Sequence, residues 1–132
     1  MKYFTIEELC ASHTAARAGI NNAPSDADKE RLTALIKELL DPLRELWGRP
    51  LKVNSGFRCA ELNGLVRGGA CSQHMRGEAA DITAGSSMLN KQLFNVLKYS
   101  GLAFDQLIDE SAYSWLHVSY STLQNRRQVL HL

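Results

Sequence analysis

The feature that most constrains the fold of this sequence is a carboxylate, Asp81, inside an otherwise apolar segment, Ala79–Thr83. Burying an unpaired carboxylate is costly, so Asp81 needs a cation or a dense set of hydrogen-bond donors around it. His74 lies seven residues before Asp81, and His117 lies 36 residues after it. Two imidazoles and a carboxylate, without a thiolate, are typical of a zinc site that leaves its fourth position open. We therefore expect a fold that brings His74, Asp81 and His117 together as zinc ligands.

Each of these residues also has an ordinary explanation when it is taken alone. Asp81 could form a structural ion pair with Arg58 or Arg76, and His117 could be a core histidine hydrogen-bonded to the backbone. The metal hypothesis is favoured because it accounts for the three residues together. Gly77 supports it further, since a glycine allows a tight turn between His74 and the segment that carries Asp81.

Length, charge and hydropathy limit the classes of protein to consider. The chain has 132 residues, the size of one compact domain, and 45% of them are hydrophobic, enough for a core. A formal net charge of +1, with scattered lysines and arginines, gives no basis for nucleic-acid binding. No apolar stretch reaches membrane-span length, and the N-terminus does not resemble a signal peptide. We expect a monomer that is made in the cytosol, has no membrane span and binds no nucleic acid.

The chain has three cysteines, Cys10, Cys59 and Cys71. An odd number argues against a disulfide framework, so we expect free thiols, although a Cys59–Cys71 bridge remains open. No C-x-x-C pair is present, which makes thiolate ligation of the metal unexpected.

The pattern of caps and apolar residues predicts the α+β class, with N-terminal helices and a mostly antiparallel sheet in a single domain. A capping box at Thr5 begins a short helix to about Ser12, and Ser25 caps a long helix that Pro42 bends or breaks. The remaining expected elements are a strand at Leu51–Asn54, a helix at Ala60–Leu65, a strand at Ala79–Thr83, a helix at Ser86–Tyr99, a hairpin of Phe104–Glu110 with Trp115–Tyr120, and an edge strand at Val129–Leu130.

Three motifs together carry a resemblance to a known family. They are Ser72-x-His74-x-x-Gly77-x-Ala79-x-Asp81, Ser55-Gly56-Phe57-Arg58 upstream of it, and Trp115-x-His117-Val118-Ser119 downstream of it. In this combination the chain resembles the M15 family of zinc D-Ala-D-Ala peptidases over about Leu51 to Tyr120. The segment Phe104-Asp105-Gln106-Leu107-Ile108 is similar to the short, phage-associated branch of the family.

The resemblance implies the Hedgehog/D,D-peptidase fold and assigns roles to particular residues. His74, Asp81 and His117 would hold zinc. Arg58 would bind a substrate carbonyl or carboxylate and stabilise the developing oxyanion, for which a permanently charged guanidinium is suited. Ser72 would hydrogen-bond the substrate, the alternative being a turn serine that prepares the His74 loop.

The general base is the one point where the sequence departs from the family. Many members have an acidic residue three positions before the second histidine, but here that position is Ser114. The nearby candidates are Asp109 and Glu110. If residues 111–114 form a four-residue loop, Glu110 lies opposite Trp115 and shares the face of His117, while Asp109 points away. We therefore expect Glu110 to be the base.

The function that the resemblance implies is hydrolysis of peptide bonds in peptidoglycan stem peptides. The family includes D-Ala-D-Ala carboxypeptidases and phage endolysins of the endopeptidase type. A lysin would reach the cell wall through a membrane pore, which suits a chain without a signal peptide. The alternative is a non-catalytic module of the same fold that keeps zinc and binds cell wall or protein, and the absence of an acid at Ser114 favours it.

Overall fold

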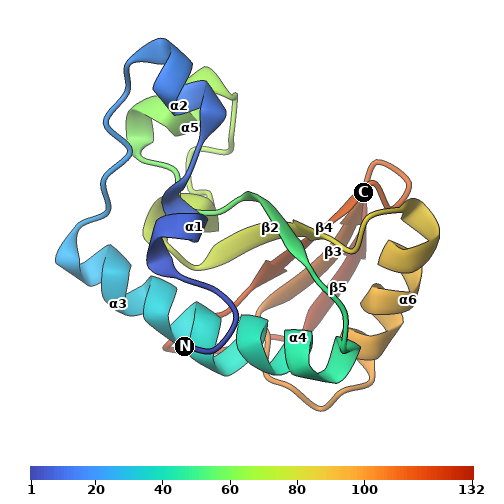
Figure 1. Cartoon of the computed structure of the whole chain (residues 1–132). Coiled ribbons are helices and arrows are strands. Elements are labelled where there is room, and N and C mark those ends of the chain that lie inside the picture. The colour runs from blue at the N-terminus through green and yellow to red at the C-terminus, as the bar shows by residue number, and fades with distance from the viewer.

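The computed structural model, which describes residues 1–132, is built on a five-stranded sheet (Figure 1). The strand order is β1-β2-β4-β3-β5, and every neighbouring pair is antiparallel except β3 and β5. The strands are β1 (Lys52–Ser55), β2 (Ala79–Thr83), β3 (Gln106–Glu110), β4 (Trp115–Ser119) and β5 (Gln128–His131). The expected α+β class with a mostly antiparallel sheet is confirmed.

One face of the sheet is apolar and the other carries polar residues, because side chains alternate along each strand. On β2 and β4, Ala80, Ile82, Leu116 and Val118 are completely buried in one hydrophobic core with leucines of the helices. The residues between them, Asp81 and His117 among them, face the opposite side of the sheet. The helices that carry these leucines therefore cover one face, and Asp81 and His117 lie on the other.

Eight helical segments surround the sheet, and none of them is long and apolar enough to cross a membrane. They are α1 (Ile6–Cys10), α2 (His13–Ala18), α3 (Asp26–Leu35), the π-helix η1 (Ile36–Leu40), α4 (Asp41–Trp47), α5 (Ala60–Leu65), the 3₁₀-helix η2 (Gln73–Arg76) and α6 (Ser87–Lys98). Hydroxyl side chains cap several N-termini: Thr5 caps α1, Ser25 forms a capping box at α3, and Ser86 caps α6.

The expected long helix is continuous in space, and the break at Pro42 takes the form of a π-helical turn (Figure 1). In an α-helix, proline removes a backbone donor and its ring clashes with the carbonyl four residues earlier. The π-helix η1 ends at Leu40, two residues before Pro42, and the N–H of Asp41 donates to the carbonyl of Ile36, five residues back. This wider turn lets the helix pass Pro42 without ending.

Two short helices lie where no helix was expected. Helix α1 ends at Cys10, two residues before the expected Ser12, and Ser12 instead caps α2, because its hydroxyl accepts a hydrogen bond from the N–H of Ala15. Ser72 does the same for the N–H of His74 at the start of η2. All three cysteines are free, so the open possibility of a Cys59–Cys71 bridge is not realised.

Gly77 ends η2 and turns the chain into β2 directly against helix α3. Its φ is +75°, a left-handed conformation that favours glycine, and a Cβ atom there would lie 2.8 Å from the carbonyl oxygen of Asp28 and 2.9 Å from Cγ of Leu32. Both His74 and Asp81 depend on this turn for their relative position. The glycine is therefore required by both its backbone conformation and the close approach of α3.

We expect Gly77→Ala to lower the free energy of unfolding by about 2 kcal/mol or more, from the left-handed backbone and the contact with α3. Gly64→Ala is the matched control, since Gly64 lies in α5 with an open Cβ position and should change stability by about +0.5 to +1 kcal/mol. Urea unfolding of both variants measures the difference. Equal stability of the two variants would contradict this account of Gly77.

Candidate metal centre and active site

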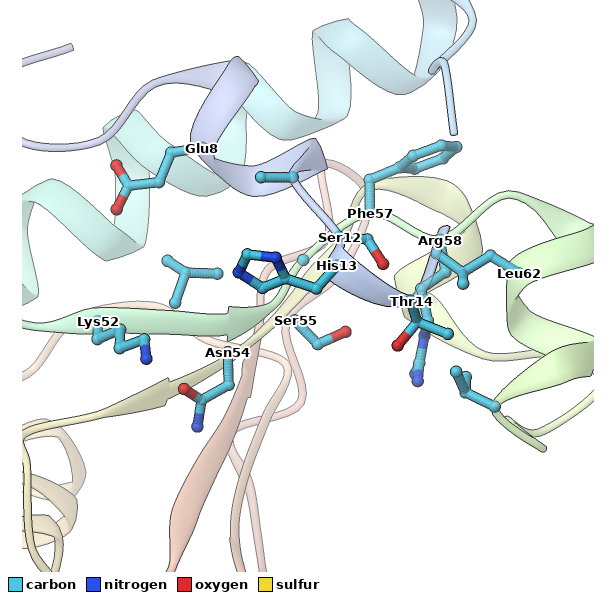
Figure 2. Close-up of a pocket in the computed structure, with 14 residues that line it drawn as sticks. Glu8, Ser12, His13, Thr14, Lys52, Asn54, Ser55, Phe57, Arg58 and Leu62 are labelled. Carbon is cyan, nitrogen blue, oxygen red and sulfur yellow. The ribbon is translucent and has the colours of Figure 1, made fainter. Parts of the chain in front are cut away.

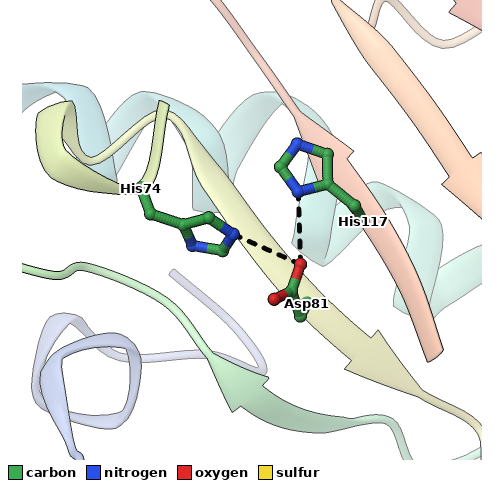
Figure 3. Close-up of side chains that lie close together, drawn as sticks. All are labelled: His74, Asp81 and His117. Carbon is green, nitrogen blue, oxygen red and sulfur yellow. Dashed lines mark hydrogen bonds and ion pairs between the residues drawn. The ribbon is translucent and has the colours of Figure 1, made fainter. Parts of the chain in front are cut away.

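Antiparallel pairing of β2 with β4 places Asp81 directly opposite His117. His74 reaches the same point from η2 (Figure 3). Oδ1 of Asp81 lies 3.2 Å from Nε2 of His74 and 3.2 Å from Nδ1 of His117. The three side chains are largely buried, with 3% of His74, 15% of Asp81 and 13% of His117 exposed. The expected convergence of these residues is therefore observed.

The orientation of His74 is set by its second ring nitrogen. Nδ1 lies 2.7 Å from the carbonyl oxygen of Gly56, which can only accept a hydrogen bond, so Nδ1 carries the proton. Gly56 itself packs closely against α1, which is possible because it has no side chain: a Cβ atom there would lie 2.2 Å from the carbonyl oxygen of Leu9. A backbone carbonyl behind a histidine ring is the usual support of a metal-binding histidine.

The donor set fits a divalent metal ion. With Nδ1 of His74 protonated, its Nε2 faces a carboxylate oxygen at 3.2 Å, so this contact is favourable either with a second proton on the ring or with a metal cation between the two atoms. A tetrahedral zinc ion with ligands at roughly 2.0–2.1 Å would separate its ligand atoms by about 3.3 Å, close to the observed 3.2 Å. The ordinary explanations are not observed, since Arg76 pairs with Glu78 and Arg58 forms no ion pair with Asp81.

The electrostatics of the site favour an ionised carboxylate. Burial alone would raise the pKa of Asp81, but hydrogen bonds and charge from His117 and His74 hold its pKa well below the ordinary range. Asp81 is therefore ionised at any physiological pH, as a carboxylate ligand of a metal would need to be. Nε2 of His117 is buried without a hydrogen-bond partner in the protein, which leaves one polar atom beside the site for a water or substrate to satisfy.

Arg58 lies at the mouth of a cleft of about 820 Å³ between the N-terminal helices and β1 (Figure 2). Its backbone N–H donates to the carbonyl oxygen of His74, 3.0 Å away, which ties the arginine to the metal centre. Nε of Arg58 is buried and has no hydrogen-bond partner. Burial lowers the pKa of its guanidinium, while the carboxylates of Asp81 and Glu110 oppose that shift. Arg58 is thus a charged residue with an unsatisfied donor that is tied to His74 and lines this cleft, while His74, Asp81 and His117 themselves are not part of the cleft lining.

The hairpin has the register expected for a four-residue loop: Glu110 pairs with Trp115 and Ile108 with His117. Glu110 therefore lies on the His117 face. Its Oε2 accepts a hydrogen bond of 2.8 Å from Nε1 of Trp115, and its other carboxylate oxygen has no partner in the protein. Asp109 points to the opposite face, where it is 5% exposed and pairs with His131. Of the two candidate bases, only Glu110 faces the site.

Ser72 and Tyr113 have structural contacts that account for their positions. The hydroxyl of Ser72 accepts the N–H of His74, which is the turn-forming alternative considered above. The ring of Tyr113 packs edge-on against Phe94, on the side of the sheet away from His117.

A buried polar cluster behind His74 was not anticipated from the sequence. Asp105, 4% exposed, accepts 2.7–2.8 Å hydrogen bonds from Nε2 of Gln73 and from the guanidinium of Arg126. These residues and His117 line a second cleft of about 600 Å³. Arg126 holds the pKa of Asp105 down to about 2. The only signal in the sequence was a carboxylate directly before β3, and its partners lie 32 and 21 residues away.

Comparisons with known proteins agree with this arrangement. A model of the peptidase M15 family matches residues 2–119, and so nearly the whole chain. A zinc D-Ala-D-Ala carboxypeptidase from Streptomyces albus G is 46% identical over 89 residues, which cover 61% of this chain and 35% of the relative. The chain thus spans about a third of the length of the curated relative that it matches.

We expect the purified protein to carry about one zinc ion per chain, because three convergent N and O donors are sufficient for a site with one open position. His74→Ala should remove most of the metal, whereas His13→Ala, at an exposed histidine in α2, should retain it. Elemental analysis after dialysis measures both. Stoichiometric zinc in His74→Ala would exclude this ligand set.

Proposed function

The chain belongs to the peptidase M15 family, and we propose that residues 1–132 form one zinc peptidase domain that hydrolyses peptide bonds of peptidoglycan stem peptides. The observation that carries this proposal is the convergence of His74, Asp81 and His117 beside two further charged groups, Arg58 and Glu110. A purely structural metal site would normally close its coordination with four protein ligands. A site with three ligands, a cleft and an oriented carboxylate is suited to catalysis.

Zinc at this site would lower the pKa of a water molecule and polarise the scissile carbonyl. His74, Asp81 and His117 would hold it. The carbonyl of Gly56 keeps His74 in the tautomer with a free Nε2, and the sheet register keeps Asp81 opposite His117. The ligands are thus oriented by the backbone before any metal binds.

Glu110 acts as the general base in this proposal. Trp115 holds one carboxylate oxygen by its indole N–H, and the other oxygen is free to accept a proton from the attacking water and return it to the leaving amine. Ser114, which stands where many relatives have an acid, donates its hydroxyl to the carbonyl of Ser111 and is engaged in the hairpin loop. Glu110, four residues earlier in the chain at the end of β3, takes over the role of base in this proposal.

Arg58 binds the substrate oxygen. A half-buried guanidinium with an unsatisfied Nε gains most from an acceptor that develops negative charge in the transition state. The same group can hold a carboxylate of the stem peptide. Ser72 adds a hydrogen bond to the substrate in this proposal, while its hydroxyl continues to accept the N–H of His74.

The cleft beside Arg58 is suited to a short peptide. Strand β1 is an edge of the sheet and lines the cleft together with polar side chains of α2 and two apolar side chains, Leu62 of α5 and Val66 directly after it. The curated relative is named for D-Ala-D-Ala carboxypeptidase activity. We propose that this chain acts as a monomer on the same class of peptide, as a carboxypeptidase or as an endolysin-type endopeptidase that reaches the wall through a membrane pore.

We expect Glu110→Gln to retain zinc and substrate affinity and to lose about 10²-fold or more in kcat, because the amide keeps the hydrogen bond from Trp115 but cannot take a proton. Asp109→Asn, on the other face, is the matched control and should change kcat far less. Mass spectrometry of stem-peptide products with zinc-loaded protein provides the measurement. Loss of activity in Asp109→Asn alone would refute the assignment, and a wild-type protein that binds stem peptides without cleaving them would establish the binding module instead.

Arg58→Ala should leave zinc content and folding intact and lower kcat/KM by about 10²-fold or more, the usual effect of removing one oxyanion donor. Arg58→Lys should rescue only in part, because an ammonium lacks the planar fork of donors. Arg17→Ala, at an exposed arginine of α2, serves as the control. Steady-state kinetics on a stem peptide tests the assignment, which fails if Arg58→Ala has normal kcat/KM.

A further inference from the structure

Asn90 of helix α6 has no role in the chemistry described above, yet it is the most thoroughly hydrogen-bonded side chain next to the site. It is completely buried. Its Oδ1 accepts the N–H of Ala84 at 2.6 Å, and its Nδ2 donates to the hydroxyl oxygen of Thr83 at 3.1 Å. Thr83 and Ala84 are the end and exit of β2, the strand that carries Asp81.

The same amide group also holds the loop of the β3–β4 hairpin. Nδ2 of Asn90 lies 2.9 Å from the carbonyl oxygen of Tyr113 and 3.1 Å from that of Ser114. One N–H serves Thr83 and the other is shared between these two carbonyls, so the donors of the amide are fully used. Asn90 therefore joins the strand of one metal ligand to the hairpin of the other.

The loop that Asn90 holds is in an unfavourable backbone conformation. Three consecutive residues without glycine among them, Ser111, Ala112 and Tyr113, have φ values of +50°, +55° and +64°. Residues with a Cβ atom disfavour this left-handed region. Such a conformation persists only where surrounding contacts determine it. Here the carbonyls at the end of the loop are fixed by Asn90, and the ring of Tyr113 is fixed against Phe94.

The conformation of this loop determines which way Glu110 points. Ser111–Ser114 connect Glu110 to Trp115, and loop length and geometry set the register of a hairpin. The bond from the indole of Trp115 to Glu110 exists only in this register. If the loop relaxed, Glu110 would leave the face of His117.

We propose that Asn90 is a positioning residue of the catalytic site: its amide holds the strained hairpin loop in the register that presents Glu110 beside His117. The inference rests on the proposed role of Glu110. Asn90 touches neither substrate nor metal in this proposal and acts only through the loop and the end of β2.

The substitution Asn90→Asp distinguishes the hydrogen bond that Asn90 accepts from the end of β2 from those that it donates to the hairpin loop. A carboxylate keeps the acceptor for the N–H of Ala84, but it has no donors, and it places negative charge against the carbonyls of Tyr113 and Ser114. Asn95→Asp is the matched control, because Asn95 is an exposed asparagine of the same helix. We expect Asn90→Asp to lower kcat at least 10-fold with KM changed less than 3-fold and zinc content unchanged, and Asn95→Asp to behave as the wild type.

A spectroscopic readout tests the position of the hairpin without relying on activity. In a Trp47→Phe background, Trp115 is the only tryptophan and reports its own surroundings. We expect Asn90→Asp to shift its emission to longer wavelength, as the indole loses Glu110 and gains water. Asn90→Ser, which is too short to reach the loop, should give the same shift and serves if the aspartate variant does not fold.

Ala112→Gly distinguishes positioning from general destabilisation. Glycine adopts the left-handed conformation without strain, so it should restore much of the kcat and the native Trp115 emission in the Asn90→Asp variant. Failure of this rescue, or a normal Trp115 emission and kcat in Asn90→Asp, would overturn the proposal. If wild-type protein has no peptidase activity, the proposed function fails, while the emission shift and its rescue still decide whether Asn90 holds the hairpin.

Discussion

The oxygen atom that Asp81 presents to two histidines is the interaction on which the rest of the site depends. An acceptor 3.2 Å from the free nitrogen of His74, in a largely buried place, is unfavourable without a cation. The protein nevertheless fixes it with backbone groups, through the carbonyl of Gly56 and the pairing of β2 with β4. The fold thus holds these three side chains in an arrangement that a bound cation stabilises, so metal binding should contribute to the stability of the folded chain.

Alternation along the strands lets one small sheet carry both a core and this site. Ile82 and Leu116 are completely buried under the helices, while their neighbours Asp81 and His117 face the opposite side of the sheet. A shift of one residue would place a carboxylate in the core and an isoleucine at the metal. The cost of that exchange makes the hydrophobic pattern itself a determinant of the ligand geometry.

Local signals in the sequence predicted much of this fold, and non-local contacts account for what they missed. The capping residues Thr5, Ser25 and Ser86 begin helices as expected, and β2 and α5 have the predicted bounds. The metal triplet was visible because a buried carboxylate is rare and demands partners. The Asn90 clamp and the Asp105 cluster were not, since an asparagine in a helix and an aspartate at a strand end have many ordinary uses. Asn90 contacts the carbonyl of Tyr113, 23 residues away, and Asp105 contacts Gln73, 32 residues away. Such distant partners are known only once the chain is folded.

The C-terminal strand β5 does not contact the site, but its pairing with β3 helps to determine which of two adjacent carboxylates, Asp109 or Glu110, faces His117. Asp109 is buried on the helix side, where it pairs with His131 of β5, and its carbonyl accepts the N–H of Leu132. A slip of one residue in β3 would pull this ion pair apart and bury Glu110 without a partner, which is costly. The backbone pairing of β5 with β3, which does not depend on the charge of Asp109, thus opposes the same slip from the edge of the sheet that Asn90 opposes at the hairpin loop. Two contacts on either side of β3 therefore select which of two neighbouring carboxylates faces His117.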